Sequence, residues 1–275
     1  MLSFNNLGNL GRLGNQMFEY AALLGISRRI GTEICIPRPS SKELRPEHQL
    51  FDAFDLKRVK HVGRQADVPQ VGEHSFAYDA NLHNNCPKDA DIIGYFQSEK
   101  YFQDIADEIR EEFRFKTMVE DYCVDVLSRF KLPKISLHVR RGDYLLYSEH
   151  FPLCSLEYYA EALSRFPTSY QVLIFSDDIG WCRTQSIFMG NRFTFFENHP
   201  NFGDMCLMSN CDHHIIANSS FSWWGAWLGK NSDKVVIAPK TWFGEKNVHA
   251  PWFIEKENRI AWDTKDLIPP TWLRI

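Results

Sequence analysis

The sequence is short of the features that mark several common classes of protein. It contains seven cysteines, an odd number, and no C-x-x-C pair, which argues against a disulfide framework and a zinc site of the usual spacing. It has no basic excess, because the formal net charge is −4, so nucleic acid is not expected as a partner. It has no apolar run of the roughly 20 residues that a membrane span needs, and no secretory leader stands out at its start. We therefore expect a cytoplasmic protein with reduced thiols, and peripheral contact with a membrane surface stays open.

What is present is enough apolar sequence for a large globular fold. Hydrophobic residues make up 44% of the 275 residues and charged residues 24%, so disorder is not indicated. A chain of this length can bury one large core or two smaller ones. We predict two domains, at residues 1–125 and 126–275.

The second half of the sequence alternates strand and helix patterns. Short apolar runs predict strands at 135–139, 172–175, 192–196, 213–217 and 235–238. The segments between them predict helices at 156–166, 204–208 and 222–228. Such alternation is typical of a parallel sheet with helices on both faces, where ligands bind beyond the carboxyl ends of the strands. The residues just after the strands are therefore the ones to inspect.

The first half of the sequence is less regular. Its clearest pattern is a helix at 14–30 that ends at Gly31, followed by a strand at 33–36. Residues 38–49 have the composition of a loop. The later part predicts a strand at 91–96 and a helix at 98–113 capped by Ser98.

Two arginines follow directly on the strand predicted at 135–139. Arg140 and Arg141 are adjacent, with Gly142 and Asp143 after them and His138 before. A guanidinium suits a phosphate group because its planar fork donates parallel hydrogen bonds. Asp143 could fix one guanidinium and leave the other for a ligand. The alternative is an Arg–Asp pair that only stabilises the end of the strand.

The next strand ends at Asp177 and Asp178, whose carboxylates could accept hydrogen bonds from a ribose or from guanine, or cap the helix that follows. A later strand gives way to a helix at Asn218, Ser219 and Ser220. Free N–H groups and hydroxyls at the start of a helix form an anion site. The alternative there is an ordinary cap followed by core tryptophans.

Residues 11–17 form a glycine-flanked turn that opens the first predicted helix, with Asn15 and Gln16 inside it. A bare G-x-x-G is a weak signal, and it fits neither the Rossmann nor the P-loop spacing. Asp89 and Asp91 have the D-x-D form of some metal-dependent enzymes, but they precede a predicted strand. We therefore expect no metal site.

Four segments in this order resemble glycosyltransferase family 11, the α-1,2-fucosyltransferases. They are residues 11–17, 94–98, 138–144 and 218–225, and residues 237–243 are also similar. The H-x-R-R-x-D element occurs in several fucosyltransferase families, and its combination with S-S-F-S-W-W-G is more specific. The resemblance covers about residues 8–245. It implies a GT-B-like α/β fold, with two Rossmann-like domains facing a cleft.

The resemblance also implies the reaction: inverting, metal-independent transfer of L-fucose from GDP-β-L-fucose to the 2-hydroxyl of a terminal β-galactoside. No cofactor beyond the donor substrate is expected, and the partners are GDP-fucose and a galactoside-terminated glycan. The residues that match the family motifs then take these roles: catalytic, Arg140, Asn15 and Asp143; donor-binding, His138, Arg140, Ser219 and Ser220; acceptor side, Asn15 and Gln16. Asp177 lies outside these motifs, and we expect it to bind the donor because of its place at the end of a strand.

Other functions stay open at this point. The donor could be another nucleotide sugar, such as GDP-mannose. The eight tryptophans could instead stack on sugars in a binding protein without catalysis, although a neutral glycan needs no double arginine. A regulatory domain that binds a mononucleotide is a third alternative.

Overall fold

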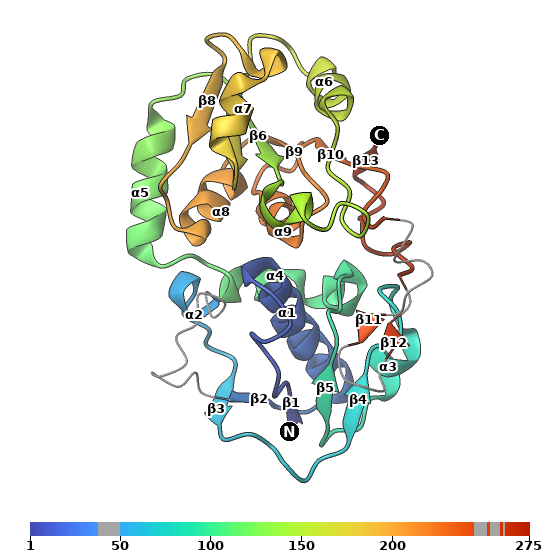
Figure 1. Ribbon diagram of the computed structural model, residues 1–275. Helices are drawn as coiled ribbons and strands as arrows, with labels where there is room; N and C mark the ends of the chain where they lie inside the picture. Colours follow the sequence, from blue (N-terminus) through green and yellow to red (C-terminus); the bar gives the residue numbers. More distant parts are fainter. Residues whose placement is uncertain (38–49, 245–251, 254–258, 261) are drawn as a thin grey trace. The chain divides into compact units, whose positions relative to one another are not determined.

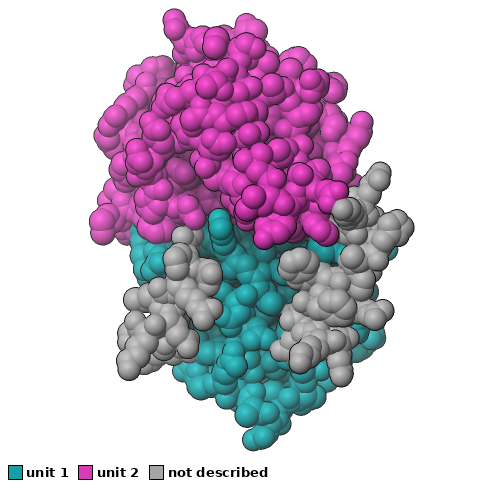
Figure 2. All heavy atoms as spheres, in the orientation of Figure 1, with its two compact units in different colours: residues 1–116, 248–269 teal, residues 117–247, 270–275 magenta. Residues whose placement is uncertain are grey.

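The computed structural model (Figure 1) describes residues 1–37, 50–244, 252–253, 259–260 and 262–275. The loop predicted at 38–49 lies outside the described residues. The chain forms two compact units (Figure 2), one of residues 1–116 with 248–269 and the other of residues 117–247 with 270–275. Each unit contains its own parallel sheet, so the predicted α/β class is confirmed.

The first unit is built on a five-stranded sheet in the order β3-β2-β1-β5-β4. All its neighbouring strands pair in parallel. The strands are β1 (Leu2–Ser3), β2 (Ile34–Pro37), β3 (Lys60–Val62), β4 (Gln70–Gly72) and β5 (Asp91–Ile93). A two-stranded antiparallel sheet, β11 (Trp252–Phe253) with β12 (Arg259–Ile260), also belongs to this unit.

Helix α1 (Leu13–Ile30) is the long helix of the first unit and is buried along most of its length. It ends as predicted at Gly31, which adopts φ 67° and donates its N–H to the carbonyl of Ser27. A methyl group at Gly25 would lie 1.9 Å from the carbonyl oxygen of Tyr101, so only glycine permits this close packing. The other helices are α2 (Leu50–Ala53), α3 (Ala80–Asn85) and α4 (Ala106–Glu112).

The helix predicted at 98–113 is interrupted. Ser98 does act as a cap, but of a 3-10 turn (Glu99–Tyr101), which is followed by a second 3-10 turn (Gln103–Ile105) and then by α4. The reason is packing: Tyr101 and Phe102 are buried, and the Phe102 ring lies 6.3 Å from that of Phe18 on α1. Tertiary contact has overridden the local helix preference.

The second unit is built on a six-stranded parallel sheet in the order β13-β10-β9-β6-β7-β8. The predicted strands and helices of this half are confirmed, with bounds shifted by a few residues. The strands are β6 (Lys134–Val139), β7 (Gln171–Ser176), β8 (Phe193–Phe196), β9 (His213–Ile215), β10 (Val236–Ala238) and β13 (Leu273–Arg274). The helices are α5 (Thr117–Ser128), α6 (Leu156–Ser164), α7 (Ile179–Thr184), α8 (Asn201–Ser209) and α9 (Ser220–Trp227).

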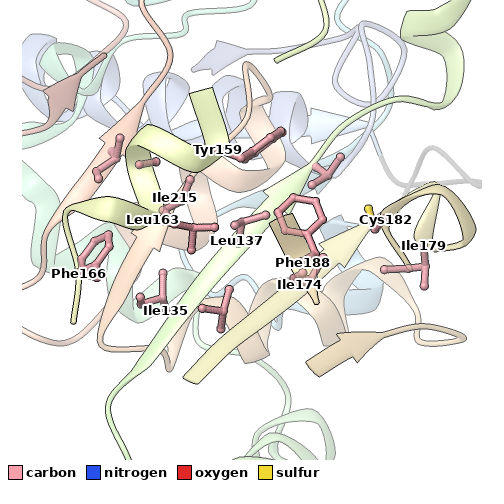
Figure 3. Packing of buried hydrophobic residues seen from close by; sticks show 14 residues of the cluster. Ile135, Leu137, Tyr159, Leu163, Phe166, Ile174, Ile179, Cys182, Phe188 and Ile215 are labelled. Carbon is pink, nitrogen blue, oxygen red and sulfur yellow. The ribbon is translucent and has the colours of Figure 1, made fainter. Parts of the chain in front are cut away.

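Aliphatic side chains fill the space between this sheet and the helix α6. In Figure 3, Leu137 of β6 and Ile215 of β9 lie against Leu163 of α6, and all three are buried. Ser155 caps α6 as predicted by accepting the N–H of Tyr158 at 3.2 Å. Helix α5 belongs to this unit, so the division between the units falls before it, at 116–117. The boundary predicted at 125–126 lies inside α5.

In each sheet the chain adds strands on one side of a central strand and then continues on its other side; we call this position the crossover point. In the second unit the chain runs from β6 to β7 and β8 on one side, and then returns to β9 on the other side of β6. In the first unit β1 likewise lies between β2 and β5. Open parallel sheets bind ligands outside the carboxyl ends of the strands at such a point. These ends are therefore the positions where a ligand site is expected. No helix in the described part of the chain is long and apolar enough to cross a membrane.

Candidate active site

Arg140 follows β6 at the crossover point of the second unit and is held between two carboxylates. Its Nη2 lies 2.5 Å from Asp143 Oδ1, and its Nη1 lies 2.8 Å from Asp177 Oδ2. Its guanidinium carbon is 5.1 Å from the centre of the Tyr144 ring, and 16% of the side chain is exposed. Asp143 thus fixes an arginine, as the sequence suggested, but that arginine is Arg140 itself, and Arg141 is paired with Asp178, so the expected division into one fixed and one free guanidinium is not found. The direction of the Arg140 fork is set before any ligand arrives.

The neighbouring Arg141 has different partners. Its Nε donates to Asp178 Oδ2 at 3.0 Å, and its guanidinium lies 3.8 Å from the centre of the Trp181 ring. The other oxygen of Asp178 accepts the N–H of Trp181 and caps α7, which is the alternative proposed for one of the two aspartates. Arg141 is therefore stacked and anchored against α7.

Gly142 allows the loop after β6 to approach β7 closely. A methyl group on Gly142 would lie 2.4 Å from Asp177 Oδ2. The other oxygen, Oδ1, accepts the backbone N–H of Arg141 at 2.9 Å. Both oxygens of Asp177 therefore hold the Arg140–Arg141 segment, and a direct contact of Asp177 with a ligand stays a prediction.

His138 lies near the end of β6, and 5% of its surface is exposed. Burial, with a smaller contribution from the charge of Arg140, lowers the pKa of its imidazole to about 3, so the ring is neutral at pH 7. Its Nδ1 is buried without a hydrogen-bond partner among the described residues, and its ring lies 5.5 Å from that of Phe221. A buried polar atom without a partner is costly, so a ligand or water is expected there.

The N-terminus of α9 lies at the carboxyl end of β9, beside β6 in the sheet. Ser219 is the N-cap residue but makes no capping hydrogen bond with its side chain, and Ser220 begins the helix. Asn218 fixes this segment by donating to the carbonyls of Pro152 and Trp242, each at 2.9 Å. The free N–H groups of a helix N-terminus favour an anion.

The tryptophans after this motif belong to the core. Trp223 and Trp224 are completely buried, and their rings lie 5.0 Å apart. Trp227 and Trp272 pack against the same pair. These side chains therefore do not form an exposed platform for sugars.

The first unit brings Asn15 together with a residue that the sequence analysis did not assign to the site. Asn15 Oδ1 accepts from Gln97 Nε2 at 3.0 Å, and Asn15 Nδ2 donates to the carbonyl of Leu10. Gln16 donates to the carbonyl of Gly11 and accepts from the N–H of Leu50, so both ends of its amide stabilise the local fold. Asn15 follows β1 and Gln97 follows β5, so the pair lies at the crossover point of this sheet.

Two fully buried glutamates support this region and were also missed. Glu73 Oε2 accepts the N–H groups of Tyr95 and Phe96, and Glu19 Oε2 accepts the N–H of Gly8 at 3.4 Å. Burial raises the pKa of each carboxyl to about 8, and the two charges would also repel each other. The segment 94–98 was a sequence signal for Gln97, whereas no motif surrounds either glutamate.

The D-x-D segment has other partners. Asp91 Oδ1 accepts from the N–H of Asn5 at 2.7 Å and from Ser3 Oγ at 3.2 Å, and Asp89 pairs with the terminal amine. Across the described ranges, no three His, Cys, Asp or Glu side chains are close enough to hold a metal ion. A reaction without a metal stays a prediction.

Known proteins resemble this chain in sequence and in fold. Residues 3–264 match the model of glycosyl transferase family 11. The chain is 33% identical to an α-1,2-colitosyltransferase of Escherichia coli, with 96% of both chains covered. It is 27% identical to the galactoside 2-α-L-fucosyltransferase SEC1 of Bos taurus, covering 81% of this chain and 63% of that one. In fold it is similar to the α-1,6-fucosyltransferase NodZ soaked with GDP-fucose, with a TM-score of 0.53 at 14% identity, covering 82% of this chain and 91% of NodZ. The likeness confirms a GT-B-like fold of Rossmann-like domains.

Proposed function

Because the chain belongs to glycosyl transferase family 11, we propose that it transfers L-fucose from GDP-β-L-fucose to the 2-hydroxyl of a terminal β-galactoside. The transfer inverts the anomeric carbon and requires no metal ion. The observation that carries this proposal is Arg140, held by Asp143 and Asp177 at the crossover point of the second unit. A fixed guanidinium at that point suits the pyrophosphate of a nucleotide sugar.

The donor contacts follow from the surroundings of Arg140. Ser219 and Ser220, at the N-terminus of α9, add hydroxyl and N–H donors for the phosphates. The neutral imidazole of His138 has a buried Nδ1 without a partner among the described residues, and this atom is a candidate for a hydrogen bond with the donor. Asp177 supports the donor site by holding Arg140, and it is also a candidate contact for the ribose or guanine.

The reaction itself is a displacement at the anomeric carbon. The acceptor oxygen forms a bond to that carbon while the bond to the GDP oxygen breaks, and GDP leaves with the electron pair. The acceptor hydroxyl gives up its proton to water or to a phosphate oxygen of the departing GDP. Negative charge grows on the pyrophosphate, and a preorganised cation stabilises this charge more in the transition state than in the ground state. Arg140 has that role. Asn15 and Gln16 belong to the acceptor side, where Gln16 acts by holding the local fold, because both ends of its amide are bonded to backbone groups.

A second donor deserves a direct test because of the relative at 33% identity, which is named for colitose. Colitose is fucose without its 3-hydroxyl. A site that forms hydrogen bonds to that hydroxyl rejects the deoxy sugar strongly, whereas an apolar site discriminates weakly. The ratio of kcat/KM for GDP-fucose to kcat/KM for GDP-colitose therefore shows whether the site forms hydrogen bonds to the 3-hydroxyl of the sugar.

The experiment combines the purified chain with GDP-fucose, GDP-colitose or GDP-mannose and a panel of terminal β-galactosides. We expect a product one deoxyhexose heavier with GDP-fucose, and an α-1,2 linkage by NMR. Preferred transfer of colitose would show that GDP-colitose is the donor, and the proposed transfer to the galactoside would still hold. Binding of GDP-fucose without transfer to any galactoside would overturn the proposed function.

A further inference from the structure

The turn after β5 adopts an unusual backbone conformation. Gly94 has φ 158° and Phe96 has φ 50°, in the region that residues with a side chain rarely occupy. Such a conformation costs of the order of 1 kcal/mol or more and persists only where the surroundings impose it. A specific contact must therefore hold the turn.

Glu73, which follows β4, supplies that contact. A single oxygen, Oε2, accepts the N–H of Tyr95 at 2.8 Å and the N–H of Phe96 at 2.9 Å. A methyl group on Gly94 would lie 2.5 Å from Cβ of Glu73, so the turn is also packed against this side chain. The carboxyl group is completely buried and cannot contact a substrate directly.

The residue after Phe96 connects this turn to Asn15 in α1. Gln97 is buried, and its Nε2 donates to Asn15 Oδ1 at 3.0 Å. A continuous series of contacts thus runs from the Glu73 carboxyl through the backbone of 95–96 and the Gln97 amide to Asn15. A shift of the turn would move the Gln97 amide and so change the orientation of Asn15.

We propose that Glu73 is a positioning residue that fixes the 94–97 turn and, through Gln97, orients the Asn15 amide for sugar transfer. This inference rests on the proposed function, because that function places Asn15 at the acceptor side. Misplacement of a positioning group by about 1 Å can cost about 10²-fold in rate.

The chain offers a matched control in Glu112. This carboxylate is also completely buried in the first unit, and its Oε2 accepts the backbone N–H groups of Lys57 at 3.0 Å and Arg58 at 3.2 Å. It also accepts the hydroxyl of Tyr20. Glu112 also forms an ion pair with Arg58 Nη1 at 2.9 Å. None of these contacts involves the 94–97 turn, so Glu112→Ala removes a buried acceptor of two backbone N–H groups without affecting the contacts from Glu73 to Asn15.

The test compares Glu73→Ala, Glu73→Gln, Glu112→Ala, Asn15→Ala and the double variant Glu73→Ala/Asn15→Ala. We expect Glu73→Ala to lower kcat/KM for the acceptor about 10²-fold, with GDP affinity unchanged within about twofold. Glu73→Gln should recover most of the loss, because the amide oxygen can still accept both N–H groups. In the Asn15→Ala background, Glu73→Ala should change kcat/KM by less than about threefold, because coupled residues are not additive.

A second measurement does not depend on activity. The side-chain amide resonance of Asn15, observed by selective ¹⁵N labelling without substrate, should move in Glu73→Ala and stay in place in Glu112→Ala. If Glu73→Ala does not fold, Glu73→Asp keeps a carboxyl group but withdraws its oxygens from the turn. Three results would each overturn the proposal. The Asn15 resonance could stay in place in Glu73→Ala, the effects of Glu73→Ala and Asn15→Ala on kcat/KM could be additive, or Glu112→Ala could lower kcat/KM for the acceptor as much as Glu73→Ala does. A wild-type protein that transfers no sugar would instead overturn the proposed function, while the NMR result would still decide whether Glu73 orients Asn15.

Discussion

Arg140 and Arg141 are adjacent in the sequence, but their surroundings give them separate tasks. Arg140 is oriented by two carboxylates, at 2.5 and 2.8 Å, and keeps donors for a ligand from its fork of five N–H groups. Arg141 is anchored to Asp178 and stacked on Trp181. Neither task could be assigned from the R-R-x-D pattern alone, because Asp143 lies three residues after Arg140 and two after Arg141, and either arginine could pair with it.

Replacing Arg140 by lysine tests its role. Lysine keeps the charge but replaces a planar fork by a compact ammonium, which cannot hold the same partners. We expect kcat to fall about 10²–10³-fold, as for the loss of a preorganised donor, with a smaller loss of GDP affinity. Steady-state kinetics and calorimetry measure these quantities.

Arg141→Lys is the internal control for this variant. It loses the stack on Trp181, so it should lower the melting temperature more than it lowers GDP affinity. A folded Arg140→Lys protein with nearly normal turnover would refute the assignment of Arg140.

Asp177 gives a second prediction at this scale. Asp177→Ala removes an ion pair to Arg140 and the acceptor of the Arg141 N–H. We expect GDP to bind about tenfold more weakly, which corresponds to about 1.4 kcal/mol and to the loss of one charge-assisted hydrogen bond. The chemical step should change less than the affinity. Calorimetry with GDP is the measurement, and unchanged affinity in the folded variant would remove Asp177 from the donor site.

At the scale of elements, the sequence predicted the second unit better than the first. The strands β6, β7 and β9 are short apolar runs separated by clear helices, which is the expected pattern for strands covered on both faces. Strand β1 spans only two residues, too few for any periodicity. The interrupted helix after Ser98 could not be predicted either, because the packing of Tyr101 and Phe102 on α1 determines it.

The same limit applies to the site. The ends of β6, β7 and β9 could be located because the alternation of elements predicts parallel strands, whose carboxyl ends lie at one edge of the sheet. Glu73 and Glu19 could not, because a glutamate is normally exposed and nothing near either residue in the sequence indicates burial. Their positions depend on α1 and on the turn after β5.

These two buried carboxyls lead to a prediction about pH. Their pKa values rise from 4.5 in the unfolded chain to about 8 in the fold, so the folded state retains protons that the unfolded state has lost. The free energy of unfolding should therefore fall as pH rises from about 5 to 8, by at most about 1.4 kcal/mol per pH unit for each carboxyl. Around Glu73 the other titratable groups are Glu19, Asp79 and Tyr101.

Glu19→Gln removes one of the two groups, so it should flatten this pH dependence in denaturant titrations at pH 5, 6.5 and 8. Glu33→Gln is a suitable control, because that carboxylate is largely exposed and pairs with Lys60. Equal slopes in the wild-type protein and in Glu19→Gln would contradict the raised pKa.

At the scale of the whole molecule, the proposed chemistry predicts that chelation leaves activity largely intact. Arg140 and the N-terminus of α9 would stabilise the charge on departing GDP, which is the task a metal ion performs in other transferases. The assay is turnover with and without EDTA. Loss of most turnover that Mn²⁺ or Mg²⁺ restores would show that a metal is required.

The chain passes between the two units after residues 116, 247 and 269, and this path has a consequence for synthesis. The first unit needs residues far along the chain, since Ser98 Oγ donates to the carbonyl of Asp266. In the second unit, β10 is paired on one side by β13, at residues 273–274. A nascent chain on the ribosome therefore cannot complete its first domain before starting the second, which is the usual order. Until β13 has been translated, one edge of β10 is unpaired in the nascent chain, and such an edge can pair with strands of other chains.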